Sequence, residues 1–227
     1  MKFSIIIPTL NETDNIHPCL LDLQLIRDQC ELIVVDGGSH DDTVEIAQVL
    51  ADKVILSDKG RAKQMNAGAK QASGEILIFL HADTFLPDDA PDLIPPGSHW
   101  GRFDIRLSGK PIMLKVISVF INIRSRLTGI ATGDQAIFVN AGLFNEIGGY
   151  PDIALMEDIS LCDLLKQKYP PTYLTEKVIS SGRRWEQFGV FKTILLMWSL
   201  RLRYFFGEKP EILATLYSGG QFCKRSI

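Results

Sequence analysis

Two polar residues, His81 and Asp83, follow directly after the apolar run at residues 76–80. Strands buried on both faces of a parallel sheet have such continuous apolar runs, and ligands bind outside their carboxyl ends. An acid at that place can hold a divalent cation that bridges the oxygens of a diphosphate. The alternative is that Asp83 only caps the turn after the strand.

Two other apolar runs end in the same way. The run at residues 32–35 is followed by Asp36. The run at residues 3–7 leads into a loop with four candidate residues: Pro8, Thr9, Asn11 and Glu12. Because the carboxyl ends of parallel strands meet at one edge of a sheet, we expect these residues to converge on one ligand site. The sequence contains neither GxGxxG nor GxxxxGK[ST], so neither common phosphate-binding loop is predicted.

The order of the elements predicts how that edge is built. Short β-branched runs alternate with helical patterns through the first half of the chain, which is typical of βαβ units and a mainly parallel sheet. One of these helices is expected to begin at Arg61 and to end at Gly74 as a C-cap. The second half predicts four further elements: a strand at 100–107, an amphipathic helix at 111–127, a strand at 135–140 and a long helix from about 189 to 206.

Composition narrows the class of protein. A chain of 227 residues with 46% hydrophobic content can bury one compact core. The four cysteines, Cys19, Cys30, Cys162 and Cys223, form no CxxC pair, so we expect free thiols in a reducing cytoplasm. The first apolar run is too short for an export signal and is interrupted by Pro8, and no run of 18 apolar residues predicts a membrane-spanning helix.

Charge is distributed unevenly along the chain. Residues 1–176 hold 15 Lys and Arg against 24 Asp and Glu, whereas residues 177–227 hold 9 against 3. A basic C-terminal segment predicts an anionic partner, either a phosphate group or a lipid surface. We expect no nucleic-acid partner.

Five stretches in order, IIIPTLNE, VVDGGSHDDT, GRAKQMNAGAKQASGEILIFLHADT, GDQAIFVN and MEDISL, resemble the family 2 glycosyltransferases. The resemblance spans residues 1–165, and SGRRW further on is similar to the (Q/R)xxRW element of some members. It implies an α/β fold of the GT-A type, with a Rossmann-like, mainly parallel sheet flanked by helices. Residues 1–180 would form the catalytic domain and residues 181–227 a C-terminal helical extension packed on or beside it.

The resemblance also implies roles for single residues. The nucleotide and its diphosphate would be bound by Pro8, Thr9, Asn11, Glu12, Arg61 and Lys63, with Asp36 at the base. Asp83 matches the last acid of the metal-binding DxD motif, so Mn²⁺ or Mg²⁺ is the expected cofactor. Asp158 matches the catalytic base, and Arg184 and Trp185 match the pair near the diphosphate and the acceptor. Asp134 lies in a loop that either faces the acceptor or forms a plain turn.

His81 departs from the family pattern, because it stands where the first acid of DxD is usual. Neutral imidazole can bind a transition metal, and it suits Mn²⁺ better than Mg²⁺. The alternative is that His81 donates a hydrogen bond to the ribose or to a nucleotide phosphate.

The implied activity is transfer of a sugar from a nucleoside-diphosphate sugar to a hydroxyl acceptor, with inversion at the anomeric carbon. Two other functions stay open: a nucleotidyltransferase of related fold, and a sugar-nucleotide binding module without activity. A Gly-rich basic loop after the first strand would favour the nucleotidyltransferase, but PTLNETDN is acidic and polar. The presence of both Asp83 and Asp158 argues against a mere binding module.

The final long helix allows two interpretations. Its charges are Lys192, Arg201 and Arg203, and among its aliphatic residues lie Trp198, Tyr204, Phe205 and Phe206. It either packs against the sheet as a core helix or lies in the interface of a membrane, together with the apolar helix near residue 115. In the second case, the acceptor would be a lipid or lipid-linked hydroxyl and the protein would be peripheral to the inner face of the membrane.

Overall fold

The computed structural model describes residues 2–219. Eight strands form one sheet in the order β3-β2-β1-β4-β7-β6-β8-β5. They are β1 (Phe3–Thr9), β2 (Cys30–Asp36), β3 (Lys53–Leu56), β4 (Ile76–Phe79), β5 (Thr84–Phe85), β6 (Trp100–Ser108), β7 (Ile137–Asn140) and β8 (Thr172–Ser181). The helices are α1 (Thr13–Asp22), α2 (Thr43–Leu50), α3 (Arg61–Gln71), α4 (Ala90–Leu93), α5 (Met113–Thr128), α6 (Ala141–Glu146), α7 (Glu157–Lys166), α8 (Arg183–Phe188), α9 (Val190–Phe205) and α10 (Pro210–Gly219).

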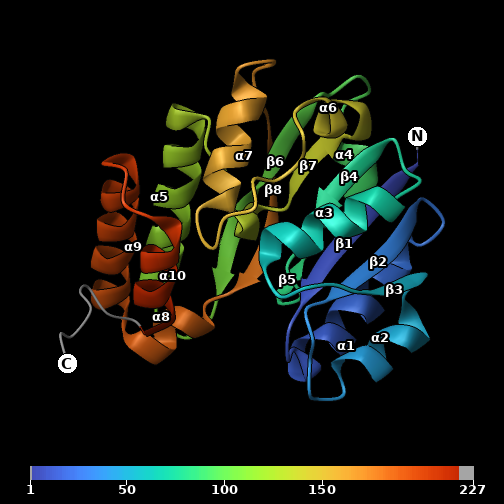
Figure 1. The fold of residues 1–227 in the computed structure, drawn as a ribbon, viewed down its shortest axis with the longest axis horizontal. Coiled ribbons are helices and arrows are strands. Elements are labelled where there is room, and N and C mark those ends of the chain that lie inside the picture. Colours follow the sequence, from blue (N-terminus) through green and yellow to red (C-terminus); the bar gives the residue numbers. More distant parts are fainter. Residues whose placement is uncertain (1, 220–227) are drawn as a thin grey trace.

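The first half of the sheet is parallel, as predicted. β1 pairs with β2 and β4, and β2 pairs with β3, all in parallel. β7 then runs antiparallel to both β4 and β6, and β6 and β8 are parallel to each other. The carboxyl ends of β1, β2 and β4 therefore lie along one edge, which confirms the predicted α/β architecture (Figure 1).

Both faces of the parallel strands are buried, which explains their unbroken apolar runs. Ile5 and Ile7 belong to one core cluster together with residues of α1, whereas Ile6 belongs to a second cluster with residues of α3 and α7. A Cβ atom at Gly68 of α3 would lie 2.5 Å from Ile6 Cγ2. The glycine thus allows α3 to approach the sheet closely.

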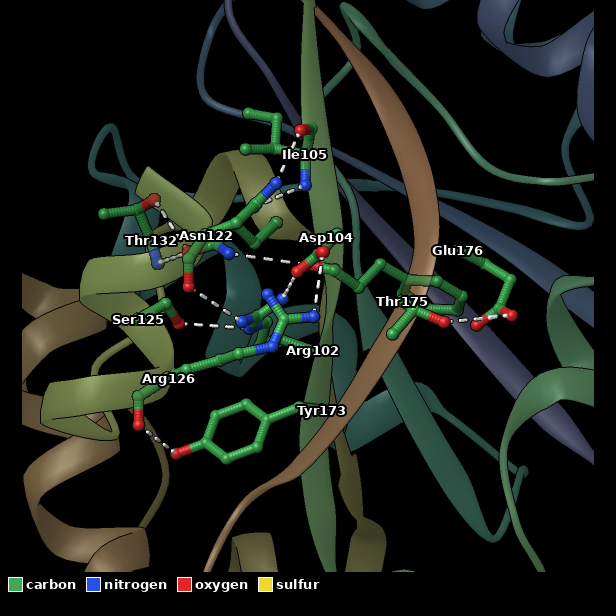
Figure 2. Close-up of polar contacts among 12 residues, drawn as sticks. Arg102, Asp104, Ile105, Asn122, Ser125, Arg126, Thr132, Tyr173, Thr175 and Glu176 are labelled. Atoms are coloured by element: carbon green, nitrogen blue, oxygen red, sulfur yellow. Dashed lines mark hydrogen bonds and ion pairs between the residues drawn. The ribbon is translucent and has the colours of Figure 1, made fainter. Parts of the chain in front are cut away.

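α5 lies along the part of β6 that does not pair with β7. β7 pairs with β6 only at Trp100 and Gly101. Beyond that point, Asn122 of α5 accepts a hydrogen bond from Ile105 N at 2.9 Å and donates one to Ile105 O at 3.0 Å. These side-chain bonds satisfy the backbone of the strand edge and hold α5 against the sheet (Figure 2).

A buried ionic network lies beside these contacts. Arg102 of β6 is fully buried and pairs with Asp104, which also accepts from Arg126 Nη2 at 2.9 Å. The Arg102 Nε atom donates to Ser125 Oγ at 3.0 Å, and its guanidinium lies 5.1 Å from the centre of the Tyr173 ring of β8. The network connects α5, β6 and β8 (Figure 2).

Some predicted elements need correction. α3 ends at Gln71, and Gly74 is no C-cap: it lies where a Cβ would be 2.7 Å from the backbone of Phe3 and Ser4. β8 and α10 were not predicted. The sequence of β8 gives no strand signal because it mixes exposed polar residues with few apolar ones. Cys19, Cys30 and Cys162 are free and buried, as expected, whereas Cys223 lies outside the described residues.

The C-terminal helices gather at one end of the molecule, beside α5 and away from α1 and α2 (Figure 1). α9 and α10 form a third apolar cluster with the start of α7, in which Leu196, Leu200, Leu213 and Leu216 are buried. Within residues 2–219, no helix is both long enough and apolar enough to cross a membrane.

Candidate functional site

A pocket of about 490 Å³ opens at the carboxyl ends of β1 and β4. Its walls also come from the first turn of α3, from α8, and from one side of α9 and α10. Eight residues predicted from the sequence line it: Pro8, Thr9, Glu12, Arg61, His81, Asp83, Arg184 and Trp185. The pocket thus joins the strand ends with the region of the RW pair, as a site for one extended ligand requires.

Four predicted residues lie outside this pocket: Asp36, Asn11, Lys63 and Asp158, which is described below. Asp36 is buried and accepts hydrogen bonds from Gly38 N at 2.9 Å and Ser39 N at 2.8 Å, so its carboxylate organises the loop after β2. Asn11 holds the same loop from the other side by accepting from His40 N at 2.9 Å. Lys63 is exposed and lies 3.7 Å from Asp58.

His81 pairs with Asp134 at the wall of the pocket. Its Nδ1 atom lies 3.3 Å from Asp134 Oδ1, and both residues line the pocket. Burial lowers the pKa of His81, but the hydrogen bond to Asp134 outweighs it and the pKa is raised overall. Because Asp134 engages Nδ1, a ligand would be contacted through the other ring nitrogen, Nε2.

Gly133 connects this pair with Asp158. A Cβ at Gly133 would lie 2.4 Å from His81 Nε2, so the imidazole ring packs directly against this glycine. The Gly133 N–H donates to Asp158 Oδ2 at 3.0 Å from the other direction. Asp158 therefore adjoins the loop that carries Asp134, although it is not among the residues that line the pocket.

Asp158 lies in the first turn of α7. Burial and the neighbouring carboxylate of Glu157 raise the pKa of Asp158 to about 6. The Gly133 and Ile159 N–H groups and Arg61 oppose that rise without cancelling it. A carboxylate with such a pKa is matched to general-base work near neutral pH.

Two acids of the pocket, Asp83 and Glu12, lie on either side of one positively charged side chain. Arg183 Nη2 lies 3.2 Å from Asp83 Oδ2 and 3.5 Å from Glu12 Oε2. Among residues 2–219, no three His, Cys, Asp or Glu side chains form a metal-binding group. The carboxylates of Asp83 and Glu12, which both contact the guanidinium of Arg183, also fit a hard divalent cation. Mg²⁺ is usually bound in proteins by one or two carboxylates, with water and phosphate oxygens as its other ligands.

Several pocket residues were not predicted from the sequence. Arg183 stands next to Arg184 in SGRRW, so its position was the available signal. Gln64 is buried and donates to Thr9 O at 2.7 Å and Val35 O at 2.8 Å, which ties the ends of β1 and β2 together. Tyr217 comes from α10, whose contact with the site has no sequence signal.

Residues 4–95 match the family model described as glycosyl transferase family 2. A PGL/p-HBAD biosynthesis glycosyltransferase of Mycobacterium bovis is 42% identical over 173 residues, which cover 65% of this chain and 62% of the relative. A dolichol-phosphate mannosyltransferase of Pyrococcus furiosus is 36% identical over 103 residues, which cover 42% of this chain and 28% of that protein. The chain thus spans less than two thirds of the length of these relatives.

Solved structures share the fold. The mannosyltransferase PcManGT from Pyrobaculum calidifontis, in complex with GDP-Man and Mn²⁺, superposes with a TM-score of 0.65 at 20% identity over 97% of this chain and 69% of that one. TarS of S. aureus in complex with UDP-GlcNAc gives 0.63 at 22% identity over 80% of this chain and 58% of that one. These similarities show that the chain has the GT-A fold, and its residues 4–95 match glycosyl transferase family 2 at the strand ends that form the pocket.

Proposed function

We propose that this protein transfers a sugar from a nucleoside-diphosphate sugar to a hydroxyl acceptor, with inversion at the anomeric carbon. The observation that carries the proposal is the pocket, whose lining holds the acids Asp83 and Glu12 together with three arginines, Arg61, Arg183 and Arg184. Cations placed around a departing diphosphate stabilise the charge that develops there. The similar structures that hold GDP-Man and UDP-GlcNAc support this class of donor.

Each group has a defined task in a single displacement. Asp158 takes the proton of the acceptor hydroxyl while that oxygen bonds to the anomeric carbon and the bond to the diphosphate breaks. Arg61 lies 3.6 Å from Glu157, the residue before Asp158. Its positive charge therefore also acts on the carboxylates of Glu157 and Asp158. Mn²⁺ or Mg²⁺, held by Asp83 with Glu12 beside it, would supply further charge neutralisation of the diphosphate.

The C-terminal extension forms part of this proposed site. Thr193 and Met197 of α9 and Tyr217 of α10 line the pocket together with residues of the strands. We therefore treat residues 1–180 as the catalytic domain and the described part of residues 181–227 as a segment that completes its wall.

Product analysis with a panel of labelled UDP- and GDP-sugars and Mn²⁺ tests the activity. We expect slow release of free sugar and nucleoside diphosphate even without the natural acceptor, because water can take the place of a hydroxyl. Release of pyrophosphate would instead identify a nucleotidyltransferase. Donor binding without any turnover would identify a binding module.

The final long helix has one buried face and one exposed face. One face of α9 is buried through Thr193, Leu196 and Leu200. The opposite face exposes a stripe of large apolar side chains at the spacing of one helix face: Phe191, Leu195, Trp198, Leu202 and Phe205. Trp198 is 71% exposed and Phe205 is 81% exposed. Water-exposed aromatic side chains in such a row mark an interaction surface.

α5 carries a second exposed stripe of the same kind. Val116, Val119, Phe120, Ile123 and Leu127 are exposed on it. Val190 and Ile194 of α9 pack against the cluster that contains Leu114 and Ile117 of α5, so the two helices are neighbours (Figure 1). We call the exposed residues of both helices the two-helix surface.

The basic residues of α5 and α9 favour an anionic membrane as the partner of the two-helix surface. Each helix contains three basic residues and no acid, and of these six residues Arg126 pairs with Asp104 and Arg203 with Glu208. From the helical repeat, Lys192 and Arg203 lie along one flank of the α9 stripe and Arg201 along the other. Aromatic residues at headgroup depth with flanking cations suit anionic lipids, whereas a second copy of this chain would bring like charges together. A lipid-linked acceptor could then reach the pocket along α9, and the protein would lie at the cytoplasmic face.

Removal of one aromatic residue should reveal this contact. We expect Trp198→Glu to lower partition onto vesicles of mixed anionic and zwitterionic phospholipid by about tenfold or more, since burial of such a side chain contributes roughly 1.5–3 kcal/mol. Co-sedimentation at low salt measures the effect. Leu25→Glu is the matched control, because Leu25 is also exposed but lies before β2, away from both helices. Wild-type protein that stays in the supernatant would contradict the membrane contact.

A further inference from the structure

Arg183 bridges two acids that come from separate loops. Glu12 lies between β1 and α1, Asp83 lies between β4 and β5, and Arg183 is the first residue of α8. The distances from its Nη2 atom are 3.2 Å to Asp83 Oδ2 and 3.5 Å to Glu12 Oε2. Without a cation between them, the two carboxylates would repel each other. Arg183 therefore holds the position that a divalent cation would take beside Asp83.

The bridge is built to open easily. The side chain of Arg183 is 55% exposed, compared with 22% for Asp83 and 25% for Glu12. Ion pairs with one largely solvated partner contribute little to stability. The surrounding backbone is held independently, since Ser181 N donates to Asp83 O at 3.2 Å. The guanidinium can thus leave the acids without disturbing the loops that carry them.

Arg184, the neighbouring arginine, is held in place by comparison. Its guanidinium lies 3.6 Å from the centre of the Tyr217 ring, and its Nη2 atom donates to the Tyr217 carbonyl. The ring of Phe188 lies on it as well, at 5.1 Å. These contacts leave Arg183 as the arginine of SGRRW with freedom to follow a ligand into the pocket.

We propose that Arg183 exchanges partners when the donor binds. Without donor, it neutralises Glu12 and Asp83; when a dication occupies Asp83, it turns to the diphosphate of the donor. This exchange rests on the proposed function, because it assumes a nucleoside diphosphate in the pocket. It makes binding of the cation and of the diphosphate depend on each other, since the cation alone must displace Arg183 without the anion that would receive it.

The exchange predicts that one substitution changes two affinities in opposite directions. In Arg183→Gln, Mn²⁺ alone should bind up to about fivefold more tightly, because its competitor is gone. UDP in the presence of Mn²⁺ should bind about tenfold more weakly or worse, because a charge-assisted hydrogen bond is lost. Electron paramagnetic resonance of free Mn²⁺ measures the first affinity, and calorimetry measures the second.

Three further variants make the result specific. Arg183→Lys should have affinities for Mn²⁺ alone and for UDP with Mn²⁺ that lie between those of the wild type and of Arg183→Gln. The lysine retains the positive charge but lacks the planar guanidinium. Lys177→Gln, which removes an exposed cation of β8 outside the pocket, should change neither affinity. Asp83→Asn should remove the dependence of UDP affinity on Mn²⁺. Circular dichroism checks that each variant is folded.

The outcomes separate this inference from the proposed function. If wild-type protein binds neither UDP nor GDP with Mn²⁺, the proposed function fails and the exchange fails with it. If wild-type protein binds either of them but Arg183→Gln leaves that binding unchanged, or weakens binding of Mn²⁺ alone, the exchange is overturned while the donor class stands.

Discussion

Replacement of Asp158 by Asn should lower the rate of transfer by about 10²- to 10⁴-fold, the usual effect of losing a general base. Binding of the nucleoside diphosphate should change little, because Asp158 is not among the residues that line the pocket. The effect should therefore appear in kcat and leave the affinity for UDP with Mn²⁺ nearly intact. Single-turnover kinetics and calorimetry on the same preparation measure the two quantities.

A matched control lies on the same helix. Asp163 of α7 is 55% exposed and lies 3.1 Å from Lys166, so Asp163→Asn removes the same charge without touching the site. It should retain the wild-type rate. Asp134→Asn is the competing test, because Asp134 lines the pocket and could act as the base in place of Asp158. Near wild-type turnover of Asp158→Asn, with a large loss in Asp134→Asn, would transfer the role to Asp134.

The pH dependence follows from the same carboxyl group. Burial and Glu157 raise the pKa of Asp158 to about 6, and a base acts only when it is deprotonated. As the pH falls through 6, kcat/KM should therefore decline by about tenfold per unit, and above about 7 it should be level. Glu157→Gln removes one of the charges that raise this pKa, so the midpoint should move to lower pH. A profile without a step near this pH would argue against Asp158.

The sequence predicted the parallel half of the sheet well, for a physical reason. Strands buried on both faces must be apolar throughout, so β1, β2 and β4 stand out as runs, and polar residues after them can only face a ligand or a turn. β8 lacks that signal. It pairs with β6 and with the two residues of β5, and Thr175, Glu176 and Lys177 in it are exposed.

The site itself was predicted in part. Residues at strand ends were placed correctly because the topology brings strand ends together, which holds for Thr9, His81 and Asp83. The partners of these residues depend on side-chain directions that no spacing encodes. His81 meets Asp134, which is 53 positions further along the chain, and Arg183 reaches back to Asp83 across 100 positions. Such contacts follow from the packing of the whole second half of the sheet.

The same reasoning explains why the buried network of α5, β6 and β8 has no sequence signature. WGRFDIRLS alternates in a way that places charged residues on a surface, yet Arg102 and Asp104 are both buried. They can be buried because each satisfies the other and because Ser125, Arg126 and Tyr173 provide the remaining contacts (Figure 2). Burial still lowers the pKa of Arg102, although Asp104 opposes that shift.

Removal of the Asp104 carboxylate should show how much stability the burial of Arg102 costs. We expect Asp104→Asn to lower the free energy of unfolding by about 3–5 kcal/mol, because the guanidinium of Arg102 would remain in the interior without an anion. For a chain of this length, that corresponds to a fall in Tm of roughly 6–20 °C. Differential scanning calorimetry and urea unfolding measure it. The exposed pair of Asp163 and Lys166 provides the comparison, since Asp163→Asn should cost less than about 1 kcal/mol.

A double variant shows whether the penalty arises from an unpaired charge or from lost packing. In Arg102→Met with Asp104→Leu, both charges are gone and similar volume is kept, so most of the stability lost in Asp104→Asn should return. If the double variant is as unstable as Asp104→Asn, the network stabilises the fold through its hydrogen bonds to α5 and not through charge compensation. Because Arg126 pairs with Asp104 from α5 at 2.9 Å, Asp104→Asn should also loosen α5 from β6. Hydrogen exchange at Ile105 and Leu107, whose N–H groups donate to Asn122 and Ser118 of α5, should then speed up before global unfolding.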